Sequence, residues 1–400
     1  MKLRDIFIVV ITLALSFQGM SQNNRAQYPG ALQNAYFQVN IGWINYPFDN
    51  TTLYPGYEAE KILVPHTAVR IIPYGYNIND YLAVHISYMR PVLWVRYKNV
   101  NGDNGNHAVF MNVGGLTVKA QYPVYNKFWI FGEAGLGVIT RTGFHSSTYP
   151  YPRIMDDANY ATFLFSGGIK YKINKKWALL FTTAYSPQAG KYHQPYTLFF
   201  GGGFEYDMYK LPENVVDKNK KSKYIFPENL VQLGYTTNYF GYGVNNFVSE
   251  GKIPVFWGGM AEIKEGFSVH FQRNFFHTYK NFAFDWGLSF SYWNSSVENT
   301  KFITISTFPV FRFILIRTKP VDFYINYSLA GPSYISGLNI DGFDTGPQFT
   351  FQDFMGIGWY FGNKRNYNIE IRIAHYSNGN LFPQNEGVKI PLTFNAGYCF

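Results

Sequence analysis

The sequence of 400 residues contains one cysteine, few charges and, beyond its first residues, no long apolar run. A single cysteine, Cys399, cannot form a disulfide within the chain and provides no lipid-anchoring site near the N-terminus. Charged residues make up 15% of the chain, against roughly 25% in ordinary soluble domains. No later segment approaches the about 18 to 20 consecutive apolar residues that a membrane-spanning helix needs. A disulfide scaffold and a helical membrane protein are therefore excluded.

Aromatic residues are abundant instead, at 20% of the chain, although the mean hydropathy is only −0.16. A transmembrane β-barrel combines these two features, because only alternate residues of each strand meet lipid. The composition therefore predicts an all-β, antiparallel transmembrane barrel, with a secreted β-sandwich or jelly roll as the soluble alternative. The pI near 9.2 agrees with an anionic partner such as lipid phosphate, and nothing in the sequence indicates a nucleic acid.

The first residues have the pattern of a secretory signal peptide. Lys2 and Arg4 precede a short apolar run, and the small residues Gly19 and Ser21 follow it. We expect residues 1–21 to be removed on export. Export together with a barrel predicts the outer membrane of a Gram-negative bacterium.

Alternation of apolar and polar residues predicts the strands. Between residues 281 and 293, for example, even positions are aromatic or aliphatic, and odd positions are mostly small or polar. Strands are expected near 34–45, 65–75, 80–93, 107–121, 127–140, 160–173, 176–186, 195–207, 229–240, 253–263, 266–276, 281–293, 301–315, 321–333, 348–361, 366–378 and 388–400. The second half of this series has nine members. Since bacterial barrels have an even number of strands, we expect one early member to be a loop or half of a bent strand.

A segment with two prolines and the basic string "KNKKSK" divides the two series of strands. It predicts a linker at 209–228 between an N-terminal barrel at 22–208, of unassigned role, and a C-terminal barrel at 229–400. The basic string is interpreted as a solvated connector, with a phosphate-binding patch as the alternative. Two tandem eight-stranded barrels are favoured over one barrel of about sixteen strands.

The stretch "IEIRIAHYSNGNLFPQNEGVKIPLTF" near the C-terminus breaks the alternation in an unusual way. His375 and Ser377 continue the apolar, outward face of their predicted strand. Their Cα atoms would lie about 6.7 Å apart, close enough for the imidazole to act as general base for the hydroxyl. Polar groups on a lipid-facing surface cost free energy, so their placement indicates a function. The loop at 378–387 is expected on the external side.

At these residues the sequence resembles a known family. "HYSNGN" followed by "PQNEG" is similar to the signature of the outer-membrane lipid A 3-O-deacylases, the PagL-like or acyloxyacyl hydrolase family. These are eight-stranded barrels that cleave an ester-linked acyl chain from lipid A. The resemblance covers residues 225–400 in strand pattern and residues 374–387 in motif.

The resemblance implies Ser377 as nucleophile and His375 as its base. It implies Asn378 and the backbone around Gly379 as oxyanion donors, with lipid A or lipopolysaccharide as substrate. No metal or organic cofactor is expected, since the remaining histidines lack metal-ligand spacing. A homodimer in the membrane is compatible with the sequence.

The third member of the triad departs from the family pattern, because the matching position is Lys389, a cation. If the apolar even positions of 388–394 face outward, Lys389 points inward and Glu386 lies beside His375. We therefore predict Glu386 as the orienting acid, with Asn385 or no acid as the alternatives.

The two halves also show a weak echo of each other, in which Ser186 aligns with Ser377 and Ala184 with His375. A duplicated first copy would thus lack the base. The sequence as a whole predicts an outer-membrane serine esterase. The alternative is a non-catalytic barrel, a surface-ligand binder or small pore, that retains a relic of the motif.

Overall fold

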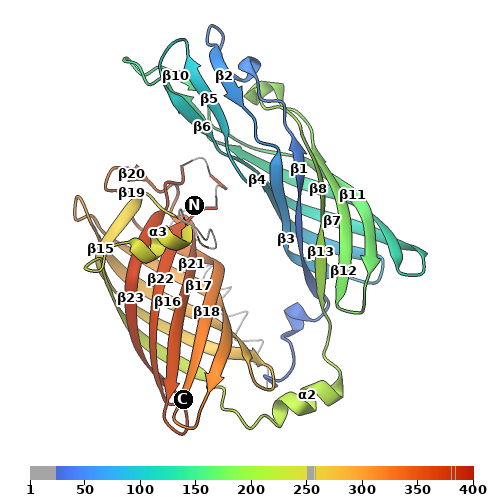
Figure 1. Cartoon of the computed structure of the whole chain (residues 1–400), viewed down its shortest axis with the longest axis vertical. Helices are drawn as coiled ribbons and strands as arrows, with labels where there is room; N and C mark the ends of the chain where they lie inside the picture. Colours follow the sequence, from blue (N-terminus) through green and yellow to red (C-terminus); the bar gives the residue numbers. More distant parts are fainter. Residues whose placement is uncertain (1–23, 250–255, 257, 380, 383) are drawn as a thin grey trace. The chain divides into compact units, whose positions relative to one another are not determined.

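The structure, a computed structural model, describes residues 24–249, 256, 258–379, 381–382 and 384–400. The signal peptide expected at 1–21 lies outside the described residues. The chain divides into two compact units, and each contains one closed barrel of eight antiparallel strands (Figure 1). The prediction of two eight-stranded barrels is confirmed, and the alternative of one sixteen-stranded barrel is wrong.

The N-terminal barrel closes in the order β1-β13-β12-β11-β8-β7-β4-β3. Its wall consists of β1 (Ala35–Asn45), β3 (Thr67–Asn77), β4 (Leu82–Pro91), β7 (Met111–Tyr125), β8 (Phe128–Arg141), β11 (Ala158–Lys172), β12 (Trp177–Ser186) and β13 (Thr197–Met208). Outside the wall lie a sheet of β2 (Ala59–Leu63), β5 (Val95–Val100) and β6 (Asn106–Val109), the pair β9 (Phe144–His145) and β10 (Arg153–Met155), and the 3-10 helices η1 (Gly30–Leu32), η2 (Asn50–Thr52) and η3 (Gly190–Tyr192).

The C-terminal barrel closes in chain order, with its last strand pairing with its first. Its strands are β14 (Asn229–Thr237), β15 (Ala261–His277), β16 (Phe282–Ser295), β17 (Lys301–Arg317), β18 (Val321–Ile335), β21 (Phe349–Phe361), β22 (Tyr367–Ser377) and β23 (Val388–Cys399). The short pair β19 (Asn339–Ile340) and β20 (Phe343–Asp344) lies in the loop before β21. Short turns join the strands at one end, where the chain terminates, and the longer loops lie at the other (Figure 1).

Two short α-helices interrupt the strands in the described part of the chain. Helix α2 (Glu213–Lys220) lies between the end of β13 and the start of β14, in the segment expected to be a linker. Helix α3 (Gly243–Ser249) follows β14. No helix in the described part of the chain is long and apolar enough to cross a membrane.

The strand expected at 253–263 is wrong as a separate element. Its described end belongs to β15, which runs unbroken through Ala261–His277, and residues 250–255 and 257 lie outside the described residues. Sequence alternation does not distinguish two strands from one long strand and the loop before it. The second half was predicted to contain nine strands, and this early segment is the one that is not a separate strand. Without it the C-terminal barrel has the even number of strands expected for a bacterial barrel.

Paired charges fill the lumen of the N-terminal barrel. Arg70 Nη2 lies 2.7 Å from Glu133 Oε1. Glu205 forms two ion pairs, with Lys119 Nζ at 3.3 Å and with Lys170 Nζ at 3.0 Å. All five side chains are buried. Removing one partner of such a pair would leave an uncompensated buried charge, which is why they occur as a network.

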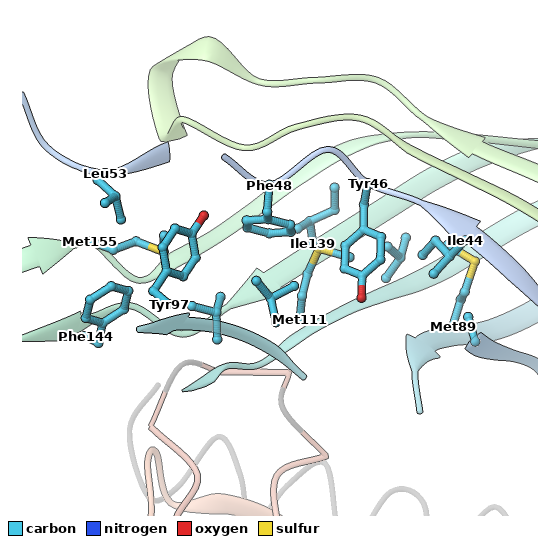
Figure 2. Close-up of a cluster of buried hydrophobic side chains, with 14 of the residues drawn as sticks. Ile44, Tyr46, Phe48, Leu53, Met89, Tyr97, Met111, Ile139, Phe144 and Met155 are labelled. Carbon is cyan, nitrogen blue, oxygen red and sulfur yellow. The ribbon is translucent and has the colours of Figure 1, made fainter. Parts of the chain in front are cut away.

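Apolar side chains then close the loop-bearing end of the same barrel (Figure 2). We call this set the outer core: Ile44, Tyr46, Phe48, Leu53, Met89, Tyr97, Met111, Ile139, Phe144 and Met155. The residues come from strand ends and from the connections between them. Burial of each large apolar side chain contributes about 1.5–3 kcal/mol, so the outer core stabilises the long loops against the barrel.

The turn between β5 and β6 depends on the buried carboxylate of Asp103. This side chain accepts hydrogen bonds from the backbone N–H groups of Val100 at 3.0 Å, Gly105 at 2.8 Å and Ser147 at 3.1 Å. His107 Nε2 lies 2.7 Å from its Oδ2. Burial by itself would raise the pKa of Asp103, but the N–H donors of Gly105 and Ser147, together with His107, lower this pKa to about 2.

Because its folded-state pKa is depressed, Asp103 stabilises the turn above its ordinary pKa of about 4 and loses this effect as the pH falls through about 2. The contribution is roughly 2 kcal/mol. We expect Asp103→Asn to speed amide hydrogen exchange of Gly105 and Ser147 up to about 30-fold at neutral pH, with no difference below pH 2. Exchange measured by mass spectrometry tests this. The exposed Glu58→Gln serves as control, and unchanged exchange in Asp103→Asn would contradict the assignment.

Candidate active site

Strand β22 places His375 and Ser377 on the outer wall of the C-terminal barrel. Along this strand Glu370 is fully buried in the lumen, whereas Ile369 on the other face is 47% exposed. The pairing of β22 with β21 is continuous from Tyr367 to Ser377, so the two-residue alternation holds throughout. His375 and Ser377 therefore share the outward face with Ile369, at the end of the strand that leads into the long loop.

A third polar residue lies on the same face. Asp353 of β21 is the register partner of His375, so the two side chains project on the same side of the sheet. Asp353 Oδ2 lies 3.6 Å from His375 Nδ1. Only 5% of Asp353 and 2% of His375 is exposed. The structure thus brings a carboxylate, an imidazole and a hydroxyl together on adjacent strands.

A β-bulge in the neighbouring strand holds Asp353. The pairing of β18 with β21 shifts between Ser328 and Gly331, and within the shift Ala330 has a φ of +53°, in the left-handed region. The backbone N–H of Ala330 donates a hydrogen bond of 2.6 Å to Asp353 Oδ1. A non-glycine residue in this conformation is strained by about 1–3 kcal/mol, and such strain concentrates at functional sites.

The last strand corrects the sequence-based placement of the acid. The pairing of β22 with β23 shifts between Arg372 and Ala374, so that β23 contains one extra residue around Pro391. Beyond the shift the alternation of β23 is reversed, and Ile390 belongs to a buried cluster in the lumen. Lys389 pairs with His375 and therefore faces outward, not inward as predicted.

The reversal also removes the reason for placing Glu386 beside His375. Glu386 precedes β23 and is exposed. Its backbone carbonyl accepts a hydrogen bond from Met260, and its N–H donates to Asp344. The carboxylate that the structure sets across from His375 is that of Asp353. A signal for it exists in the sequence, because Asp353 interrupts an otherwise apolar outward row between Phe349 and Ile357.

Lys389 is engaged with the segment that follows β14. Its Nζ lies 3.0 Å from Asn246 Oδ1 of α3 and 3.3 Å from Glu262 Oε1 of β15. Asn245 of the same helix donates to the carbonyl of Ile390 at 2.9 Å. These contacts hold α3 against β23 beside the polar face.

Aromatic rings cover His375 on the outside. The Phe256 ring lies edge-on to the His375 ring, with centroids 6.3 Å apart, and 6.4 Å from the ring of Tyr327 on β18. Phe256 is itself buried. The imidazole is therefore shielded although its strand face points outward, while Ser377, one step nearer the loop, is half-buried.

Asn378 holds the loop that begins after Ser377. Its N–H donates to Asn385 Oδ1 at 2.7 Å, and its Nδ2 donates to the Gln384 carbonyl at 2.5 Å. Gly379 follows with a φ of +65°. The sequence predicted Asn378 as an oxyanion donor, and in the structure each of these two donor groups gives one hydrogen bond that closes the loop. Among the described residues, no group of three or more histidine, cysteine, aspartate or glutamate side chains is arranged to hold a metal ion.

Gly387 allows the loop to return close to His375. Its φ is +69°, which disfavours side chains, and a Cβ there would lie 3.1 Å from His375 Nε2. The backbone conformation therefore favours glycine, and an added Cβ would require His375 to shift by a few tenths of an ångström.

The residues that the weak similarity between the two halves aligns do not occupy equivalent positions in the two barrels. Ala184 and Ser186 are buried on β12, and the exposed residues of that strand include Phe181 and Tyr185. Ser186 thus faces the lumen, whereas Ser377 faces outward.

Comparisons with known proteins agree with this architecture. Residues 265–398 match the family model described as lipid A 3-O-deacylase (PagL), and residues 32–216 match the OmpA-like transmembrane domain. No curated protein sequence matches the chain.

Several solved structures are similar to part of the chain. The crystal structure of the outer membrane enzyme PagL is 16% identical, covers 43% of this chain and 99% of its own, and has a TM-score of 0.31. Neisserial surface protein A is 13% identical over 44% of this chain and 97% of its own, with a TM-score of 0.29. The N-terminal β-barrel domain of Pseudomonas aeruginosa OprF is 15% identical over 44% and 98%, with a TM-score of 0.27. From the two family models, the C-terminal barrel is similar to the lipid A 3-O-deacylases, as its motif predicted, and the chain is an outer-membrane β-barrel protein of a Gram-negative bacterium.

Proposed function

We propose that the C-terminal barrel is a serine esterase that hydrolyses ester-linked acyl chains of lipid A, with Ser377 as nucleophile and His375 as general base. The observation that carries the proposal is the position of both side chains on the outward wall, in a barrel that matches a lipid A deacylase model. Their strand ends at the long loops, which in outer-membrane barrels are extracellular. Lipopolysaccharide occupies that leaflet, so the nucleophile lies at the depth of the substrate's ester bonds.

The reaction follows the general course of acyl transfer by an activated hydroxyl. His375 takes the proton of Ser377 as its Oγ attacks the ester carbonyl carbon, and then returns that proton to the departing sugar oxygen. The acyl group remains on Ser377 as an ester. Water, deprotonated by the same imidazole, attacks this ester and releases the fatty acid, which restores the serine hydroxyl.

The wall beside Ser377 is suited to an acyl chain. Phe351 is the register partner of Ser377, and its ring packs edge-on against Phe349 with centroids 5.1 Å apart. Met355 continues the same outward row along β21. An acyl chain lying against this row stays within the hydrocarbon while its ester reaches the hydroxyl, which reduces the cost of binding.

The negative charge that develops on the carbonyl oxygen needs donors near the start of the loop. We assign this role to the backbone at Gly379 and assign to Asn378 the role of fixing the loop through Asn385 and Gln384. The backbone at Gly379 keeps the role that the family resemblance implies, whereas Asn378 departs from it.

Ser377→Ala should abolish release of fatty acid from purified lipid A, and His375→Ala should lower the rate by about 10²–10⁴-fold. Mass spectrometry of the lipid A product measures both and identifies the bond that is cleaved. Ser186→Ala is the matched control, because it removes a serine from the N-terminal barrel. Heat-modifiable gel mobility verifies that each variant is folded. Full activity in Ser377→Ala would support the relic alternative.

Gly387→Ala should lower kcat by about 10–100-fold, because the added methyl group presses on His375 Nε2 and a small displacement of a catalytic group is costly. Gly342→Ala separates this effect from backbone strain. Gly342 also has a positive φ, +84°, but a Cβ there would meet open space. Equal loss of activity in the two variants would show that strain alone is responsible.

A further inference from the structure

We propose that Asp353 is the acid that orients His375, a role supplied by β21 and not by the last strand. This inference rests on the proposed function. Asp353 acts through the histidine and does not touch the substrate, so it is a positioning residue. Three independent features of the structure lead to it.

The first feature is the pairing itself. Asp353 and His375 are direct partners in a continuous stretch of the ladder, and Oδ2 lies 3.6 Å from Nδ1. With both backbones fixed by the sheet, a small rotation of the imidazole closes this distance to a hydrogen bond. When the carboxylate holds the imidazole proton on Nδ1, Nε2 carries a free lone pair. This lone pair can accept the proton of Ser377.

The second feature is the support given to the carboxylate. Asp353 Oδ1 accepts the Ala330 N–H, which leaves Oδ2 directed at the histidine. This N–H is available because the β18 bulge turns Ala330 out of the regular ladder at a positive φ. A bulge that aims one amide at one carboxylate is the kind of distortion found next to active sites.

The third feature is the charge on the other side of His375. The family's acid position is occupied by Lys389, which faces outward as the register partner of His375 and whose Nζ lies 3.3 Å from Glu262. A cation there cannot accept the Nδ1 proton. Among the described residues, the titratable groups near His375 include its register partners Asp353 from β21 and Lys389 from β23, and Tyr327 from β18, whose ring contacts the Phe256 ring that covers His375. Of these three, Asp353 is the acid that can orient the imidazole.

During the reaction Asp353 remains ionised. When His375 takes the proton of Ser377, the imidazolium bears both ring protons, and the neighbouring carboxylate stabilises this charge. The proton returns from Nε2 to the leaving sugar oxygen, so none is transferred to Asp353. Its removal should therefore affect kcat far more than KM.

The test compares Asp353→Asn with Glu386→Gln in the full-length protein, reconstituted in vesicles that contain lipid A. We expect Asp353→Asn to lower kcat by about 10²–10⁴-fold with KM unchanged. Asp353→Glu should recover part of the rate. We expect Glu386→Gln to retain wild-type kinetics.

Loss of activity in Glu386→Gln with wild-type activity in Asp353→Asn would overturn the inference and restore the sequence-based acid. A second readout does not depend on turnover. Nitrogen NMR of labelled histidine should show His375 protonated at Nδ1 in the wild type and a shift of the proton toward Nε2 in Asp353→Asn. An unchanged tautomer would overturn the inference. Absence of fatty-acid release by the wild-type protein, with the tautomer change present, would reject the proposed function while leaving the Asp353–His375 coupling intact.

Discussion

A closed sheet surrounded by lipid fixes which face of every strand must be apolar, and this constraint governs the whole chain. The hydrogen bonds between strands satisfy the backbone N–H and C=O groups. The free energy of placing the barrel in the membrane therefore depends on the side chains, which alternate strictly between lumen and lipid. In the C-terminal barrel the alternation is kept along β21 and β22 up to Asp353, His375 and Ser377. Each of these groups is costly on that face, and they are neighbours in register. Three separate exceptions at one place are best explained by a shared chemical role.

Two register shifts of the barrel lie beside this group, and none lies within the pair of strands that carries it. The ladder between β21 and β22 is regular over its full length, whereas the β18–β21 and β22–β23 pairings each contain a shift near the polar face. One shift directs the Ala330 N–H at Asp353, and the other turns Lys389 to the outside. A regular central pair keeps Asp353, His375 and Ser377 at fixed spacing, since each side chain's direction follows from an undistorted strand. The flanking strands carry the irregular geometry that completes the surroundings.

This division explains which parts of the molecule the sequence could predict. The barrels, nearly all wall strands and the pair His375 and Ser377 follow from alternation, which is a local property of the chain. The identity of the acid is not local. Assigning odd and even residues of the last strand to the inner and outer faces assumes an unbroken register. One additional residue near Pro391 reverses the face on which every side chain beyond it lies. Pro391 is visible in the sequence, but its effect depends on how β22 pairs with it. Asp353 becomes a neighbour of His375 only through that same pairing of strands.

The two barrels have the same number of strands but differ in where the polar residues near their loop ends lie. In both, buried ion pairs occupy the lumen, as Arg70 with Glu133 in the first and Arg372 with Glu370 in the second. In each lumen these charges neutralise one another. The first barrel keeps Ser186 inside and closes its loop end with the outer core. The second carries its polar group on the outward wall, where a lipid can approach by lateral diffusion with its acyl chains already in hydrocarbon. A lipid substrate of the proposed esterase would not have to leave the membrane to react, which is the physical advantage of placing a nucleophile on the outside of a barrel.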